Sequence, residues 1–414
     1  MKLHLPKLHI VRLRKIFLTV IIIAVIFSLG FYLGERNYSI SIKNFKVQIS
    51  RSLPVDHEDV DFSLFWKVWD ILENSYLDSS KVKSSEMVYG AIQGMVAAIG
   101  DPYTVFLPPT QNKVVQEDLQ GNFGGIGIQI GFKGKQLAVM APLPGTPAEE
   151  AGIKAGDFII GIKDEKKGID MGTSGISSAE AVQVIRGDVG TKVILTLLRD
   201  GNSDPIVVEI IRKDIVVPSV IVSYVGEEGS IAHVKLLKFA GETNGEWEKA
   251  VSGILKKSPK GIILDLRNNP GGYLQGAVDI AGEFLNGDTL VTYEESSTGK
   301  QNEFRTDKLP RLQRFPLVLL VNGGSASASE ILAGALSEQA KIKVVGETTF
   351  GKGTIQEPKQ LENGAGLHIT IAKWLTPKGN WVNEKGLKPD VIVEDNLETT
   401  DDEQLSKALE VISQ

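Results

Sequence analysis

The chain has 414 residues, of which 42% are hydrophobic and 23% charged, and its formal net charge is −6. These values are typical of a globular protein with two or three domains, and with no long basic run they argue against a nucleic-acid partner. No cysteine is present, which excludes disulfides and thiol catalysis and suits an exported protein. His, Asp and Glu do not cluster at metal-ligand spacing, so neither a metal nor another cofactor is expected.

The N-terminus predicts a membrane anchor. Residues 1–15 are basic and lack an acidic residue, and residues 16–34 form an uncharged apolar run. Such a run approaches the roughly 20 residues that a helix needs to cross a bilayer, and the basic flank stays in the cytoplasm. We therefore expect a cytoplasmic tail (1–15), a single transmembrane helix (16–34) and an extracytoplasmic remainder. The alternative is a cleaved signal peptide, although the run is long for one and no A-x-A site follows.

Two helices are predicted after a tether. Residues 35–60 are polar and lack a clear period, so we expect them to tether the anchor to the rest of the chain. Large apolar residues then recur at helical spacing and indicate a helix with a core face: Phe62, Phe65, Trp66, Trp69, Leu72 and Tyr76. A second helix is expected over 85–99, with Gly100 as its stop and four inward residues: Met87, Ala91, Met95 and Ile99. Residues 61–112 are taken as one N-terminal helical segment.

The residues with catalytic potential are concentrated between 317 and 356. An apolar run at 317–321 has strand composition, and a small-residue turn leads from it into a helical pattern. Such a turn exposes a nucleophile beside the free N–H groups of a helix start. A second strand is expected at 342–345, and Lys352 follows it between two glycines.

A lysine can activate a serine hydroxyl only when its amine is neutral. Its pKa must then fall from about 10.4 to near 7, a change of roughly 4 kcal/mol that burial can supply. From the local sequence alone, a surface lysine in a glycine turn is the alternative interpretation.

The segments SASASEILAGAL (325–336) and GETTFGKGTIQ (346–356) resemble the catalytic core of the carboxy-terminal processing proteases, also called tail-specific proteases. These are serine proteases with a Ser-Lys dyad, a PDZ domain and a crotonase-like catalytic fold. The resemblance implies that Ser327 is the nucleophile and that Lys352, 25 residues later (352 − 327 = 25), is the base. Gln356 falls on the family's third catalytic position.

The implied fold class is multidomain α/β. It comprises a crotonase/ClpP-like catalytic domain (201–397), an inserted β-rich PDZ domain, N-terminal helices, a single transmembrane helix and a C-terminal tail (398–414). Alternating strands and helices from residue 215 onward are typical of α/β structure. The tail is expected to be helical through Leu405, Ala408 and Ile412, and to pack on the body or on a second subunit of a homo-oligomer.

A predicted strand at 261–266 leads into the sequence RNNPGG. The D-L-R-x-N-P-G-G pattern resembles the family's oxyanion loop. By this resemblance the N–H of Gly271 or Gly272 stabilises the tetrahedral oxyanion together with the N–H of Ala328. An ordinary strand-to-helix turn is the alternative.

Glycine alternates with apolar residues over 121–131. Successive N–H groups in such a loop can hold a peptide carboxylate while the peptide adds as a strand at a sheet edge, although glycine-rich turns without a ligand are commoner. The sequence that follows resembles a bacterial PDZ domain, taken as residues 113–200, with a helix capped by Ser178 and closing strands at 192–198 and 206–211. The resemblance assigns carboxylate binding to Gly124, Gly125, Ile126, Gly127 and Ile128. The preceding DPYTVFLPP (101–109) resembles the family's lead-in to this domain.

Three other functions compete. Residues 346–352 fit G-x-x-x-x-G-K, but Gly353 replaces the Ser or Thr of a phosphate-binding loop and the helical pattern is broken. A Ser-His-Asp hydrolase would use His233 or His368, whereas a strand histidine ordinarily faces solvent or is satisfied in the core. A non-enzymatic PDZ protein could capture exported C-termini, but degeneration usually removes the nucleophile or the base.

The sequence therefore predicts a membrane-anchored bacterial serine endopeptidase that acts on polypeptides with free, apolar C-termini. Ser327 forms an acyl-enzyme and neutral Lys352 accepts its proton, while Gln356 orients Lys352.

Overall fold

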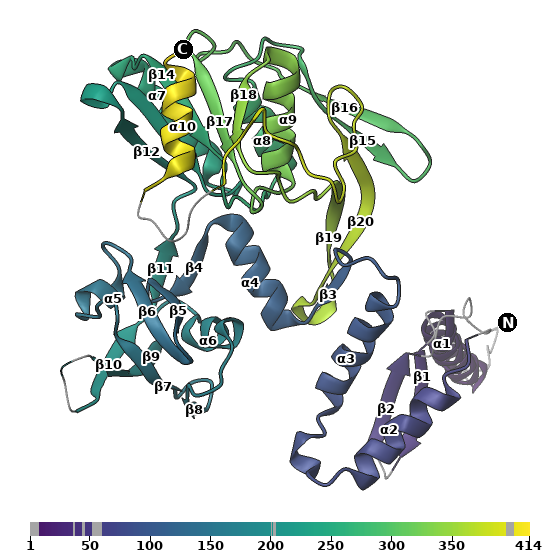
Figure 1. The fold of residues 1–414 in the computed structure, drawn as a ribbon. Helices are drawn as coiled ribbons and strands as arrows, with labels where there is room; N and C mark the ends of the chain where they lie inside the picture. The colour runs from purple at the N-terminus through teal and green to yellow at the C-terminus, as the bar shows by residue number, and fades with distance from the viewer. Residues whose placement is uncertain are drawn as a thin grey trace, which may run out of the picture. The chain divides into compact units, whose positions relative to one another are not determined.

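The computed structural model describes residues 8–35, 38–43, 46–51, 60–199, 201, 204–394 and 401–414 (Figure 1). It divides into two compact units, residues 1–87 and 88–414. The first contains α1 (Leu8–Glu35), β1 (Tyr38–Lys43), β2 (Lys46–Arg51), α2 (Ser63–Ser75) and the 3-10 helix η2 (Ser79–Lys81). Helix α3 (Ser84–Ala97) crosses the division.

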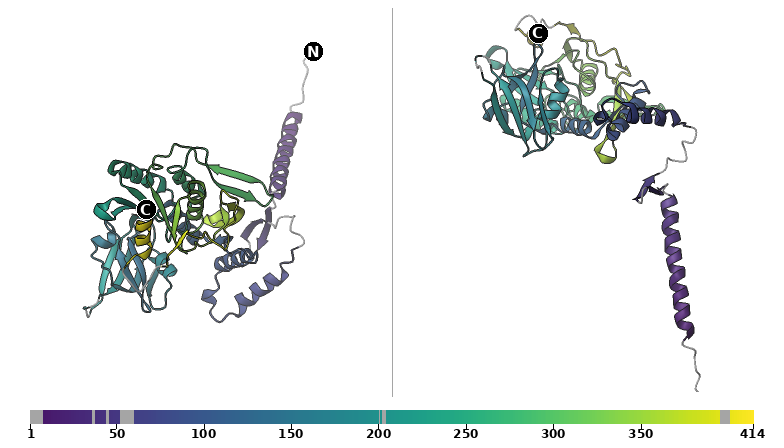
Figure 2. Two further views of the ribbon diagram at one scale, coloured as in Figure 1. Left: turned by 45° about the horizontal axis from the view of Figure 1, so that its top comes forward. Right: turned by 90° about the horizontal axis from the view of Figure 1, so that it is seen from below.

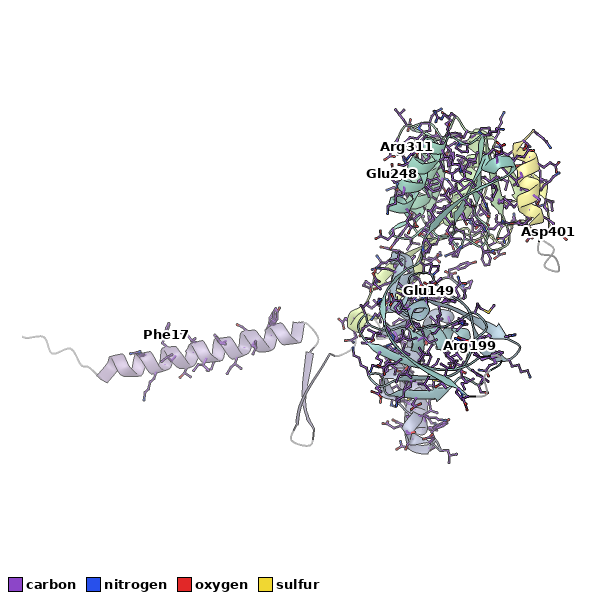
Figure 3. The ribbon with its side chains drawn as sticks, turned by 90° about the vertical axis from the view of Figure 1, so that its left-hand side faces the viewer. Phe17, Glu149, Arg199, Glu248, Arg311 and Asp401 are labelled. Atoms are coloured by element: carbon purple, nitrogen blue, oxygen red, sulfur yellow. The ribbon has the colours of Figure 1, made fainter. Side chains whose placement is uncertain are left out.

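Helix α1 begins at Leu8, so it includes part of the basic segment that we predicted as a tail. Within it, Arg14–Tyr32 is long and apolar enough to cross a membrane. The apolar side chains of this stretch, such as Phe17 in Figure 3, are exposed.

The hairpin β1–β2 lies within the predicted tether (35–60), in which we found no clear period. Isoleucines alternate with polar residues along β1, and Ile40 and Ile42 lie opposite Ile49 and Val47 of β2. This period of two is the pattern of a strand with one apolar face, and it was overlooked in a polar context. The rest of the predicted tether, residues 52–59, lies outside the described residues.

Helix α2 forms as predicted, but its aromatic face is not a core. None of its residues is buried, and Trp66 is 55% exposed. Its rings contact each other instead, with the Phe65 and Trp69 centroids 6.0 Å apart. A helical period shows that a face is apolar, but it does not say what covers that face.

Helix α3 also presents a different face from the predicted one. Tyr89, Ile92 and Val96 pack around Phe106, whereas Met95 is exposed, as is Ile99 beyond the helix. The partner strand decides this rotation, because the helix has apolar residues on more than one side. Gly100, with φ +80°, follows the helix end as predicted.

The segment after α3 leads into a β-rich region. It contains β3 (Val105–Leu107), α4 (Pro109–Gln120), β4 (Asn122–Gly125), β5 (Ile128–Lys133), β6 (Gln136–Pro142), α5 (Pro147–Glu150), β7 (Phe158–Asp164), β8 (Ile169–Gly172), α6 (Ser178–Ile185), β9 (Lys192–Leu198), β10 (Ile206–Ile211) and β11 (Lys213–Val216). The strand order is β10-β9-β7-β6-β5, with β8 on β7, so β5 lies at an edge. The sheet thus continues through β10, beyond the predicted boundary at residue 200.

One local prediction in this region was wrong, and one helix was not predicted. Ser177, not Ser178, caps α6, and Glu180 completes its capping box. Helix α4 was not predicted, because its mean composition is polar and its signals are subtle. Proline stands in its first turn, and Gly121 ends it with φ +94°.

The remaining chain forms an α/β layer structure. Its elements are β12 (Val220–Val225), η3 (Glu227–Gly229), β13 (Ile231–Leu236), α7 (Thr243–Lys257), β14 (Gly261–Asp265), α8 (Leu274–Ala281), β15 (Leu290–Ser296), β16 (Gln301–Arg305), β17 (Leu317–Val321), α9 (Ala328–Ala340), β18 (Lys343–Gly346), β19 (Thr354–Gln360), η4 (Glu362–Gly364), β20 (Gly366–Leu375), β21 (Val391–Ile392) and α10 (Glu403–Ile412). The main sheet has the order β12-β13-β14-β17-β18-β21, and its pairs from β13 to β21 are parallel. A second sheet has the order β16-β15-β20-β19, with β3 on β20.

Helices cover both faces of the main sheet (Figure 2). Residues such as Val234 and Leu264 face α7, α8 and α9, while Ile263 and Leu320 face α10. Strands buried on both sides read as continuous apolar runs, which explains why β14 and β17 were predicted well. The tail helix α10 packs on this body through Ala408, which is the first of the two alternatives that the sequence left open.

Two arginines, each bonded to more than one carboxylate, hold loops around the main sheet in place. Arg311 bonds Glu248 at 2.5 and 2.7 Å (Figure 3) and also reaches the buried Glu283. Arg267, directly after β14, bonds Asp265 and both carboxylate oxygens of Asp402 at the start of α10. The loop after β14 is therefore tied to the C-terminal helix.

Candidate active site

Three adjacent parallel strands, β14, β17 and β18, end at one edge of the main sheet. Loops that follow the carboxyl ends of such strands converge, and this is where α/β sheets place their sites. The loop after β14 carries Gly271 and Gly272, the turn after β17 carries Ser327, and the loop after β18 carries Lys352. These four residues and Gln356 line one cleft of about 600 Å³.

Ser327 occupies the turn between β17 and α9, with φ +54° and ψ −116°. A non-glycine residue in this region is strained by roughly 1–3 kcal/mol and persists only when its surroundings hold it. Its N–H donates to Glu330 Oε2 at 2.8 Å, which ties the turn to the first helical turn. The hydroxyl is thereby presented at the N-terminus of α9.

Glu330 joins the turn that carries Ser327 to the loop that carries Lys352. Its side chain is fully buried. Oε2 accepts from the N–H of Ser327 and of Lys352 (2.9 Å), and Oε1 accepts from the N–H of Gly351 (2.7 Å) and the hydroxyl of Thr349 (2.5 Å). Glu330 was not among the predicted site residues, although the S-x-x-E spacing from Ser327 is a capping-box signal that could have identified it.

Lys352 is largely enclosed. Burial lowers the pKa of its amine below the ordinary value of 10.5, while the carboxylates of Asp101 and Glu330 act in the opposite direction. Its Nζ lies 5.1 Å from the centroid of the Tyr103 ring, and its carbonyl accepts from Trp374 Nε1 at 2.8 Å. This is the environment that favours a neutral lysine.

Gln356 lies on β19 in the same cleft. Its Nε2 donates to the hydroxyls of Thr354 (2.9 Å) and Thr370 (3.1 Å). Both N–H donors of the amide are thus engaged, and within the described residues no hydrogen bond joins Gln356 to Lys352, which the sequence had led us to expect it to orient. Within the described residues, no hydrogen bond joins Ser327 Oγ to Lys352 Nζ. The distance between a serine and its base is often longer in structures without substrate.

The two glycines of the predicted oxyanion loop differ. The N–H of Gly271 already donates to Asn269 Oδ1 at 2.9 Å. A Cβ on Gly271 would stand 2.9 Å from the Ser327 Cβ and 3.0 Å from the Ala328 N, so the loop approaches Ser327 as closely as glycine permits. Gly272 has φ +136° and lines the cleft. The N–H of Ala328 is the first of α9 and lies outside the helical ladder.

The predicted carboxylate loop borders a second, smaller groove of about 60 Å³ between β5 and α6. Gly125, Ile126, Gly127 and Ile128 line it, whereas Gly124 does not. Gly124 pairs with Asp214 of β11 instead. Because β5 is an edge strand, its free side can accept an added strand.

The residues of the alternative sites, a histidine base, a phosphate-binding loop and a metal site, are arranged differently from Ser327 and Lys352. His233 on β13 is buried, and its Nε2 lies 3.0 Å from Asp265 Oδ2 on β14. His368 does line the cleft, and burial followed by the nearby Lys352 charge lowers its pKa. The segment after Lys352 is a strand, β19, whereas a phosphate-binding loop is followed by a helix, so the structure does not support that alternative. The searched, described residues contain no group of three His, Asp or Glu that could hold a metal.

Comparisons with protein families define the class. Residues 230–393 match Peptidase family S41, residues 139–199 match a PDZ domain, and residues 25–109 match the N-terminal domain of the activating protease CtpB. These matches classify the chain as a serine-type peptidase with a PDZ domain.

Relatives narrow this class. The chain is 35% identical to the carboxy-terminal processing protease CtpA of Bacillus subtilis over 336 residues, which are 81% of this chain and 70% of that protein. It is 34% identical to CtpB of the same organism over 79% of this chain and 66% of the relative. The chain belongs to the carboxy-terminal processing protease family. A crystal structure of a putative S41 protease from Bacteroides fragilis shares the fold, with 15% identity, a TM-score of 0.55, and coverage of 87% of this chain and 99% of that one.

Proposed function

We propose that this protein is a membrane-anchored endopeptidase in which Ser327 is the nucleophile and neutral Lys352 the general base. The observation that carries the proposal is that a strained serine and an enclosed lysine lie in one cleft, on loops held by a single buried carboxylate. We further assign the catalytic α/β region to the crotonase-like class.

In the proposed reaction, Lys352 accepts the hydroxyl proton as Ser327 attacks the peptide carbonyl. The N–H groups of Ala328 and Gly272 stabilise the oxyanion, since that of Gly271 is already engaged. Protonated Lys352 returns its proton to the leaving amine, and the neutral amine then activates the water that releases the acyl group. Gln356, held by its hydrogen bonds to Thr354 and Thr370, lies in the same cleft and helps to orient Lys352.

The proposed substrate is a polypeptide with a free, apolar C-terminus. The groove between β5 and α6 is lined by isoleucines, and the glycine-rich connection at its end offers N–H groups to a carboxylate. We propose that a C-terminus adds to β5 as a strand. Binding by a Ser327→Ala variant should weaken strongly when the same peptide carries a C-terminal amide, and equal affinity would overturn the assignment of the loop.

The proposed location is the cytoplasmic membrane, with α1 as a single span and the peptidase on the outer side. The apolar stretch of α1 and the basic residues before it support this orientation. Carbonate washing should leave the full-length chain in the membrane fraction. Release of a shortened chain would indicate a cleaved signal peptide instead.

The central test uses the full-length chain in detergent micelles and an unfolded polypeptide with an apolar free C-terminus. Ser327→Ala and Lys352→Ala should each abolish cleavage, and Lys352→Arg should also fail because arginine stays protonated. Lys359→Ala, on the exposed end of β19, is the matched control and should cleave normally. If none of these proteins cleaves while the peptide still binds, a PDZ capture protein becomes the better description.

A further inference from the structure

The segment DPYT at residues 101–104 lies beside the catalytic lysine rather than only leading into the PDZ domain. Strand β3 follows it directly and pairs antiparallel with β20, with Val105 opposite His368. His368 lines the cleft of Ser327 and Lys352. The pairing therefore brings residues from before the PDZ domain to a site built mainly by residues after it, and it accounts for the contact of the Tyr103 ring with Lys352 Nζ at 5.1 Å.

The turn that carries Tyr103 is fixed by hydrogen bonds. Asp101 accepts from the Tyr103 N–H at 3.0 Å and from the Thr104 hydroxyl at 2.6 Å. The Thr104 hydroxyl in turn accepts from the N–H of Thr370 on β20 at 3.1 Å. The Thr370 hydroxyl accepts from Gln356 Nε2 at 3.1 Å, so Thr104 and Thr370 together link Asp101 to the predicted third catalytic residue.

The two side chains of this turn differ in charge. Burial works against ionisation of Asp101, but its hydrogen bonds from Thr104, Thr370 and the backbone lower its pKa on balance, so it is a carboxylate at neutral pH. Burial, and then the charges of Glu330, Asp101 and Glu384, raise the pKa of Tyr103, so its phenol stays neutral. The lysine amine thus contacts a neutral ring and lies within the electrostatic influence of an anion.

We propose that Asp101 and Tyr103 are positioning residues for the base, with the Tyr103 ring excluding water from the Lys352 amine and the Asp101 carboxylate balancing its charge when protonated. The proposal rests on the proposed function, in which Lys352 is the base.

The two residues act on the amine in opposite directions. Covering an ammonium group removes hydration, and a ring replaces only part of it, so Tyr103 favours the neutral amine. Asp101 and Glu330 favour the charged form. His368, from β20, is held neutral beside the same amine. With both positioning residues present, the lysine can lose its proton for attack and still hold one for the leaving group.

The test is the pH profile of kcat/KM for the full-length chain in detergent. Replacing Tyr103 with alanine admits water, so the acidic limb should move to higher pH and kcat/KM on that limb should be several-fold below wild type. Asp101→Asn removes the anion, so the limb should move to lower pH and kcat/KM there should be several-fold higher. Tyr103→Phe keeps the ring and should follow the wild-type profile.

A second readout does not need turnover. In a Ser327→Ala background, the pH dependence of acetylation of Lys352 by acetic anhydride, followed by mass spectrometry, reports the titration of the amine directly. It should move upward with Tyr103→Ala and downward with Asp101→Asn.

The outcomes separate the two hypotheses. Turnover by Lys352→Ala would overturn the proposed function and this inference with it. Loss of turnover in Lys352→Ala, together with unchanged titration of Lys352 in the Tyr103→Ala and Asp101→Asn variants, would overturn only the positioning role.

Discussion

The buried carboxylate of Glu330 offers the sharpest structural test of the site. Glu330→Gln keeps the shape but turns one oxygen into an N–H₂ donor. If the N–H₂ group takes the place of Oε1, the Gly351 N–H loses its acceptor. The Thr349 hydroxyl, in contrast, can rotate and accept a hydrogen bond from the new N–H₂ group. Placed at Oε2, it would face two backbone donors, those of Ser327 and Lys352, so the first orientation is preferred.

The cost follows from these contacts. An orphaned buried N–H costs roughly 1–3 kcal/mol, and each remaining bond weakens by about 1 kcal/mol when the carboxylate charge is lost. Glu330→Gln should therefore lower the free energy of unfolding by roughly 3–5 kcal/mol. Since both loops shift when the carboxylate is replaced, kcat should fall by about 100-fold, the effect of a misplacement near 1 Å.

The assay combines denaturant unfolding, followed by tryptophan fluorescence, with single-turnover cleavage. Glu248→Gln is the matched control, because it makes the same substitution in an exposed ion pair whose partner Arg311 keeps Glu283. The control should lose less than about 1 kcal/mol and no activity. Equal losses in the two variants would show that Glu330 does not hold the two loops in place.

Three further predictions concern pH and the histidines. Because burial lowers the pKa of Lys352, kcat/KM should rise with pH along a limb whose midpoint lies below 10.5, and a midpoint at or above it would contradict the enclosed base. Burial opposes ionisation of Asp265, but hydrogen bonds from His233 and Arg267 lower its pKa to about 2. Its ionised form should therefore contribute about 2 kcal/mol of stability above pH 4, lost as the pH falls toward 2, and Arg267→Met should move acid unfolding to higher pH in a circular-dichroism titration. His368→Asn should retain cleavage, and its inactivity, with intact folding, would revive the histidine-base alternative.

Much of the catalytic region could be predicted from the sequence. The strands β14 and β17 are continuous apolar runs bounded by glycine or proline, a pattern that burial on both faces imposes. The roles of Ser327 and Lys352 were implied by the resemblance of two short motifs to the carboxy-terminal processing proteases, and the structure brings both residues into one cleft. Helix faces were harder, because the apolar residues of α2 and α3 fit a helical period without showing which side a neighbour covers.

The contacts of the site required the tertiary structure. Glu330 and the segment DPYT can be read in the sequence, but their distances from Lys352 cannot. The strand order β14-β17-β18 brings Glu330 to the lysine, and the pairing of β3 with β20 brings DPYT there.

The sequence by itself determined the chemistry that is present: a serine and a lysine on glycine-rich turns, an apolar N-terminal run and a glycine-rich loop before a strand. Tertiary structure alone decided which N–H groups are occupied, which face of each helix is covered, and that Tyr103, 249 residues before Lys352 (352 − 103 = 249), lies against its amine. The physical reason is that local periodicity fixes the conformation of a segment, whereas the protonation state of a buried amine depends on charges and rings brought by distant strands.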